Sequence, residues 1–212
     1  MKGFVTEPAL IEKKSLEIIS GILSAEMPEK LHFSPAELTV VKRVIHTTAD
    51  FEYTSILEFN NDPITAITLA LQDGCHIITD TVMALSGINK RVPVKYGVQV
   101  KCFMSDEIVA KEAREKGVTR AMISMEKAAL DPQNGIYVIG NAPTALVKLL
   151  ELVEQGYRPR AIIGVPVGFV GALESKELLA ASTIPHIVSR GRKGGSNVAA
   201  AIMNAISYLT EE

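Results

Sequence analysis

The stretch PHIVSRGRKGGSNVAAAIMNAI, residues 185–206, decides the fold. Its first five residues form a short apolar run, which predicts a buried strand. Ser196 then opens a run rich in alanine and isoleucine, which predicts a packed helix. The loop between them, residues 190–195, holds three glycines and three basic side chains. We therefore expect a strand, a basic glycine loop and a helix in succession.

The same alternation of strands and helices extends over the last two thirds of the chain. The first third is predicted to be helical, with a capping box at Ser34 and Glu37. We predict a three-layer α/β/α fold with a doubly wound, mostly parallel sheet of about five strands and an N-terminal helical segment. Residues 1–212 are expected to form a single domain. The predicted strands are CHIITD (75–80), VQVKCFM (98–104), IYVIGN (136–141), AIIGVPV (161–167) and PHIVS (185–189).

The composition excludes several classes of protein. A net charge of −2 argues against a general nucleic-acid or membrane-surface binder. No segment reaches the roughly 18 apolar residues of a membrane span, and residues 1–10 do not resemble a signal peptide. Cys75 and Cys102 lie in apolar runs, which favours buried thiols in a reducing cytoplasm over a disulfide. The histidines and cysteines lack metal-ligand spacing, so we expect no metal site.

The carboxyl ends of the predicted strands are where a ligand should bind, because doubly wound sheets place their ligands beyond that edge. Polar segments follow four of the strands, and all four should face the same edge. They are residues 79–80, 140–144, 166–168 and 190–196.

The basic glycine loop, residues 190–195, is predicted to hold an anion. Arg190 and Arg192 offer planar donors suited to carboxylate or phosphate. Gly194 and Gly195 let the backbone approach a ligand, and Ser196 begins a helix whose N-terminus attracts negative charge. The loop lacks the spacing of a P-loop, because its lysine precedes the last glycines. The alternative is a flexible glycine turn with solvated charges.

A second turn from strand to helix, IGNAPTAL at residues 139–146, carries Asn141 and Thr144. These side chains could donate and accept neutral hydrogen bonds with a ligand. The same residues also make a good helix start, with Asn141 as a cap and Pro143 in the first turn, so both interpretations stay open.

His46 is the candidate proton donor among the four histidines. Arg43 lies three residues before it and Asp50 four residues after it, so the three side chains could share one helix face. A carboxylate within hydrogen-bond range would orient the imidazole, which is a common proton shuttle near neutral pH. The alternative is a partly exposed helix histidine with incidental charged neighbours.

The chain contains four distinctive motifs: VIHTTADFEY (44–53), IGNAPTAL (139–146), GVPVGFVGALESKE (164–177) and RGRKGGSNVAAAIMNAI (190–206). Together they resemble the precorrin-8X methylmutase family. The resemblance extends in order from about Ser15 to the end of the chain. The HTTADF variant is more similar to the cobalt-early, anaerobic branch, whose substrate is cobalt-precorrin-8.

This resemblance implies a homodimeric isomerase that moves a methyl group from ring carbon 11 to ring carbon 12 of a corrinoid, a [1,5]-sigmatropic shift. The family's catalytic histidine falls on His46, and its substrate-contacting residues fall on Ser15, Arg43 and Arg120. Aerobic members often have glycine and a small residue where this chain has Ala49-Asp50, which puts an Asp50–His46 pair in doubt as a shared feature. The shift needs no redox cofactor, and His46 would donate a proton or hydrogen bond to the ring.

Two other functions remain as alternatives. One is an unrelated α/β enzyme that holds a nucleotide or sugar phosphate on the glycine loop. Nucleotide affinity would favour it. The other is a non-catalytic corrinoid carrier, which would bind the ring without converting it.

Overall fold

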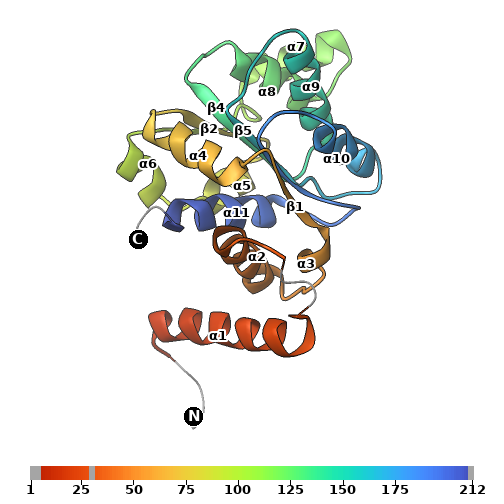
Figure 1. The fold of residues 1–212 in the computed structure, drawn as a ribbon. Helices are drawn as coiled ribbons and strands as arrows, with labels where there is room; N and C mark the ends of the chain where they lie inside the picture. The colour runs from red at the N-terminus through yellow and green to blue at the C-terminus, as the bar shows by residue number, and fades with distance from the viewer. Residues whose placement is uncertain (1–5, 29–31, 210–212) are drawn as a thin grey trace.

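The computed structural model describes residues 6–28 and 32–209 of the 212-residue chain (Figure 1). Residues 1–5 lie outside the described residues; they belong to the segment 1–10, which does not resemble a signal peptide. A six-stranded sheet of order β1-β6-β5-β4-β2-β3 forms the centre, and only β1 is antiparallel to its neighbour. The strands are β1 (Leu57–Asn60), β2 (His76–Thr79), β3 (Val100–Lys101), β4 (Asn134–Ile139), β5 (Ala161–Gly164) and β6 (His186–Ser189).

The predicted fold class is confirmed, and all five predicted strands are present. The strand β1 was not predicted, because its residues LEFN are mostly half-buried and lack a continuous apolar run. This strand lies at the edge of the sheet and pairs with β6 from Leu57 opposite Ser189 to Asn60 opposite His186. The segment after the second helix therefore ends up beside the strand that carries the glycine loop.

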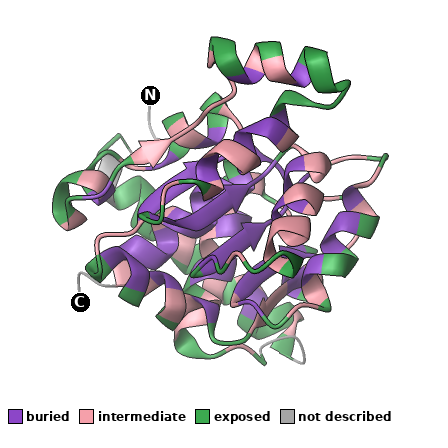
Figure 2. Cartoon of the chain, turned by 90° about the horizontal axis from the view of Figure 1, so that it is seen from above, coloured by how far each residue is buried: buried purple, intermediate pink, exposed green. Residues whose placement is uncertain are grey.

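Helices cover both faces of the sheet, and the four central strands, β6, β5, β4 and β2, are buried (Figure 2). Successive strand residues point to opposite faces: Ile77 and Ile163 pack in one core cluster, whereas Ile78 and Ile162 pack in another. The first cluster is covered by α4 (Pro63–Gln72) and α11 (Ser196–Leu209), with α5 (Val82–Gly87) beside them. The second is covered by α8 (Arg120–Ala129), α9 (Pro143–Glu154) and α10 (Ala172–Ala180).

The N-terminal helical segment stacks on the α11 side of the sheet (Figure 1). The helix α2 (Pro35–Thr48) packs on α11, and α1 (Pro8–Glu26) packs on α2. The predicted capping box is confirmed, because Ser34 Oγ accepts the Glu37 N–H and the Glu37 carboxylate accepts the Ser34 N–H. The remaining helices are α3 (Tyr53–Ile56), α6 (Arg91–Tyr96) and α7 (Glu107–Lys116). Within the described residues, none of the helices is long and apolar enough to cross a membrane.

Candidate active site

The loops after β2, β4, β5 and β6 meet at one edge of the sheet, as the parallel topology requires. Two glycines allow these loops to pack closely. A Cβ on Gly140 would lie 2.7 Å from the Gly195 carbonyl oxygen, and a Cβ on Gly194 would lie 2.1 Å from the Val165 carbonyl oxygen. Any side chain at either position would push the loops apart, so both positions require glycine.

A buried carboxylate holds the loop that carries Asn141. Asp80 is fully buried at the end of β2 and accepts backbone N–H groups from Gly140 (3.0 Å), Asn141 (2.7 Å) and Ala142 (2.6 Å). Burial raises the pKa of Asp80, although the three hydrogen bonds oppose that rise. Asp80 therefore fixes the backbone, and the exposed Asn141 side chain lies at the carboxyl edge.

The three cations of the glycine loop have different environments. Arg190 pairs with Glu58 of β1, its Nε 2.8 Å from the carboxylate. The Lys193 ammonium contacts Asp50 at 2.5 Å and Glu52 at 2.8 Å, which lowers the pKa of Asp50 and raises that of Lys193. These two cations fasten the loop to the N-terminal part of the chain.

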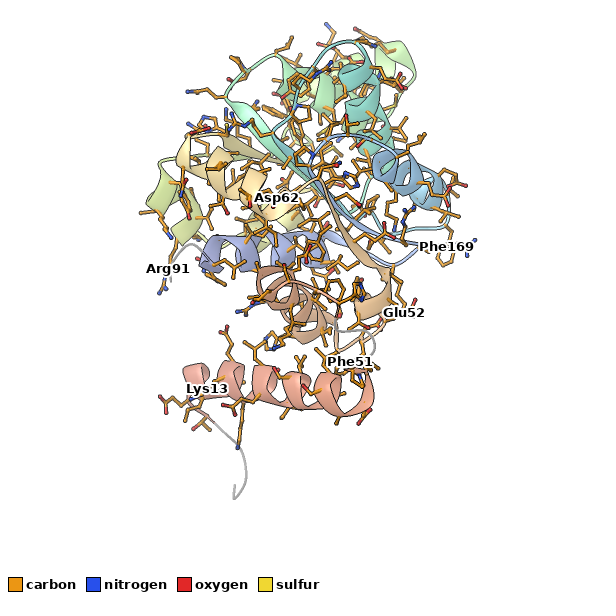
Figure 3. All side chains as sticks on the ribbon, viewed as in Figure 1. Lys13, Phe51, Glu52, Asp62, Arg91 and Phe169 are labelled. Carbon is orange, nitrogen blue, oxygen red and sulfur yellow. The ribbon has the colours of Figure 1, made fainter. Side chains whose placement is uncertain are left out.

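Arg192 is the cation left for a ligand. Among the described residues it has no carboxylate partner, and its guanidinium lies 5.8 Å from the centroid of the Phe169 ring. Phe169 is 87% exposed and projects from the margin of the molecule (Figure 3). An exposed arginine backed by an aromatic ring can bind an anion without first breaking an ion pair.

Part of the loop backbone is already occupied. The Gly195 N–H donates to the Val165 carbonyl at 3.0 Å, and the Ser196 hydroxyl is 2.8 Å from that of Thr81. The Gly194 N–H has no acceptor among the described residues. Of Gly194 and Gly195, only Gly194 therefore has an amide available to an anion.

His46 is oriented by a serine rather than by the predicted carboxylate. Ser15 Oγ of α1 lies 2.7 Å from His46 Nδ1 of α2. The prediction that Asp50 pairs with His46 is wrong, because α2 ends at Thr48 and Ala49 adopts a left-handed conformation (φ 54°). That turn takes Asp50 off the helix face and toward Lys193. His46 Nε2 has no hydrogen-bond partner in the described part of the chain.

His46 lines two pockets. One, of about 300 Å³, lies where α2 meets α5 and α11 and includes the polar side chains of Arg43, Asn197, Asn204 and Tyr208. The other, of about 430 Å³, is mainly apolar, lies between α1 and α2, and includes Ser15 and Phe51. Figure 3 shows Phe51 lying toward α1. His46 therefore lies between a polar pocket and an apolar pocket.

The residues that α11 contributes to the polar pocket were not predicted from the sequence. Asn197 and Asn204 are seven residues apart, a spacing that places both on one helix face and could have been noticed. Asn204 Oδ1 accepts the backbone N–H of Asn89 at 2.8 Å, and the side-chain amide of Asn89 donates to the Tyr208 hydroxyl at 2.7 Å. These bonds hold one wall of the pocket.

Arg43 is held from two sides. Its guanidinium contacts Glu12 of α1 at 2.6 Å and lies 5.4 Å from the centroid of the Tyr208 ring. A ligand carboxylate would therefore have to share Arg43 with Glu12.

Arg120 and Thr144 lie together, away from the His46 pockets. Thr119 caps α8, and its hydroxyl is 2.9 Å from the Thr144 hydroxyl at the start of α9. Arg120 is the first residue of α8; it is exposed and, within the described residues, unpaired. The structure thus brings together Arg120 and Thr144 but places neither in the lining of the two pockets at His46.

The site offers no ligand set for a metal, since no three His, Cys, Asp or Glu side chains in residues 6–28 and 32–209 are grouped to hold one. A largely parallel sheet with a basic loop at its carboxyl edge defines a doubly wound α/β protein, and its oriented histidine, His46, lies at the junction of two pockets.

Comparison with known proteins identifies the family. A model of the precorrin-8X methylmutase family matches residues 10–209. The cobalt-precorrin-8 methylmutases of Salmonella typhimurium and Priestia megaterium are 46% and 42% identical to this chain. The alignments cover 99% of this chain, and 99% and 92% of those proteins. The solved precorrin-8X methylmutase of Thermus thermophilus is 36% identical, with a TM-score of 0.85 over 95% of both chains. The chain belongs to the precorrin-8X methylmutase family.

Proposed function

We propose that this chain is a cobalt-precorrin-8 methylmutase that moves a methyl group from C-11 to C-12 of the ring, with His46 as the proton donor. Methylmutases move a methyl group within one molecule, so the reaction is an isomerisation of cobalamin biosynthesis. The relatives from Salmonella typhimurium and Priestia megaterium, which carry the cobalt substrate in their names, support the cobalt form. The observation that carries the proposal is the hydrogen bond between Ser15 and His46 at the junction of two pockets.

The proton would leave from His46 Nε2. If the Ser15 hydroxyl donates to Nδ1, the proton of the neutral imidazole lies on Nε2, which has no partner among the described residues. A hydrogen bond or proton from Nε2 to the conjugated ring would redistribute its electrons and stabilise the transition state of the shift. Ser15 therefore acts by orienting the donor.

The substrate is a polyanion, and exposed arginines would bind its carboxylates. Arg192 and Arg120 have no carboxylate partner in the described residues. Thr144 contacts Thr119, the residue before Arg120, and could add a neutral hydrogen bond, as could the exposed Asn141 side chain. Arg190 and Lys193 are already paired with carboxylates, so we assign them to the shape of the loop. Local cations of this kind suit an anionic ligand on a protein with a net charge of only −2.

We also propose that the enzyme is a homodimer acting in the cytoplasm. The polar pocket at His46, of about 300 Å³, is small for a flat macrocycle wider than a nucleotide base. The outer helix α1 carries three exposed apolar side chains, as expected of a surface that a second subunit covers. They are Leu10, Ile11 and Ile18, whose exposed fractions are 47%, 47% and 60%. A second subunit placed there would add walls to the site. The free Cys75 and Cys102 fit a reducing compartment.

The proposal is tested by incubating the protein with precorrin-8X and with its cobalt form, followed by absorption spectroscopy. The methyl shift changes the conjugation of the ring, so conversion changes the colour. Conversion of either substrate supports the proposal, and faster conversion of cobalt-precorrin-8 supports the cobalt form. Tight binding without conversion would indicate a carrier, and affinity for a nucleotide instead would indicate an unrelated phosphate-binding enzyme.

A further inference from the structure

Lys176 of α10 is a fully buried lysine. Lysine is almost never fully buried unless it is paired with an acid. Among the described residues, however, no carboxylate lies within ion-pair distance of its ammonium. Its Nζ donates instead to the Lys193 carbonyl at 2.9 Å and lies 3.5 Å from Ser189 Oγ. Burying a cation without a carboxylate partner costs free energy, and in this chain the buried ammonium contacts the glycine loop instead.

The Lys193 carbonyl receives two hydrogen bonds from the interior. Besides Lys176, the Ser189 hydroxyl donates to it at 2.8 Å. A carbonyl oxygen has two lone pairs, so these donors satisfy it completely and hold it inward. The orientation of the peptide between Lys193 and Gly194 is therefore set from beneath the loop.

The geometry of the peptide bond transmits this orientation to the other side of the loop. No peptide bond in the described chain is cis, and in a trans peptide the N–H points opposite to the C=O. With the Lys193 carbonyl held inward by Lys176, the Gly194 N–H is directed the opposite way, and it has no acceptor among the described residues. Arg192 immediately precedes this peptide, and its own carbonyl accepts the Gly168 N–H at 3.2 Å.

We propose that Lys176 is a positioning residue: by holding the Lys193 carbonyl inward, it presents the Gly194 amide and the Arg192 guanidinium to one carboxylate of the substrate. This inference rests on the proposed function for the identity of the anion. It extends that function by naming the residue within the chain that sets the shape of the loop. Lys176 touches no substrate and acts only through the loop.

The variant Lys176→Met tests this, since methionine approximates the length of the side chain and lacks the ammonium. We expect the product, hydrogenobyrinate or its cobalt form, to bind at least tenfold more weakly. We expect kcat at saturation to change less than threefold, because the Ser15–His46 pair is untouched. The matched control is Lys148→Met on α9, where the ammonium pairs with Glu126 and Glu151, and its affinity for the product should be unchanged.

A double-mutant cycle with Arg192→Ala separates positioning from general damage. If Lys176 positions Arg192, Arg192→Ala should weaken product binding about tenfold in the wild type but less than threefold in Lys176→Met. Equal losses in the two backgrounds, or wild-type affinity in Lys176→Met, would overturn the inference. If Lys176→Met does not fold, Lys176→Leu removes the same ammonium with a shorter side chain. An unchanged affinity in that variant would overturn the inference equally.

Hydrogen exchange gives a readout that does not depend on the ligand. In Lys176→Met the amides of Gly195 and Gly168, which bond within and beside the loop, should exchange faster, while the Val165 amide, which bonds to β4, should not change. Unchanged exchange at all three amides would contradict the inference. If exchange changes as expected but Arg192→Ala leaves binding intact in the wild type, the carboxylate role of Arg192 fails and the positioning of the loop by Lys176 stands.

Discussion

Lys176→Met should alter the dependence of stability on pH, because burial lowers the pKa of Lys176 to about 8 in the folded protein. In the unfolded chain the pKa of lysine is about 10.4. Below about pH 8 the Lys176 ammonium is protonated in both the folded and the unfolded state, so burying its charge lowers the free energy of unfolding by the full amount. Between these two values the unfolded state binds more protons than the folded state, so the free energy of unfolding rises with pH.

The size of this effect follows from the two pKa values. From about pH 7 to about pH 9.5, the contribution of Lys176 to the free energy of unfolding should become more favourable by about 2 kcal/mol. Other groups titrate in the same range, but they are common to wild type and variant and cancel in the difference. Burial raises the pKa of Tyr53 to about 12, which affects stability only above the titration of an unfolded tyrosine near pH 10.

Urea unfolding of the wild type and of Lys176→Met at several pH values measures this difference. The control is Lys148→Met, because Glu151 and Glu126 raise the pKa of Lys148. A raised lysine pKa contributes stability that is constant below the unfolded pKa and is lost only above it. The difference in free energy of unfolding between wild type and Lys148→Met should therefore not depend on pH over the same range. If the difference between wild type and Lys176→Met is also independent of pH, the reasoning that the buried ammonium lacks a compensating carboxylate is refuted.

Three further variants test the site and the assembly. His46→Ala should fold and bind corrinoid but turn over about 10²–10⁴-fold more slowly; near-normal turnover in the absorption assay would remove His46 from the mechanism. Gly194→Ala should weaken product binding at least tenfold without a change of charge, since its Cβ would meet the Val165 carbonyl; an unchanged affinity would show that the close packing of the loop does not matter for binding. Ile18→Asp should convert a dimer into monomers in sedimentation at micromolar concentration and reduce activity; a wild-type monomer with full activity would contradict the dimer.

Much of the fold could be predicted because its signals are local. The buried strands appear as short apolar runs, and the helix after Ser34 begins with a capping box whose partners are three residues apart. The parallel arrangement then places the ends of four strands at one edge, so the position of the glycine loop follows from the pattern as well. β1 escaped prediction because half-buried edge strands lack the continuous apolar run of central ones.

The contacts of the site could not be predicted, because they join residues far apart in the chain. His46 is oriented by Ser15, 31 residues earlier, and Lys193 pairs with Asp50, 143 residues earlier. Sequence spacing favoured Asp50 as the partner of His46, but the left-handed turn at Ala49 takes Asp50 away from the helix. Local pattern therefore determined the strands, the helices and the candidate residues. Only the packing of α1 on α2, and of the glycine loop on the buried Lys176, decided which of those residues meet, because a side chain bonds to the nearest partner in space.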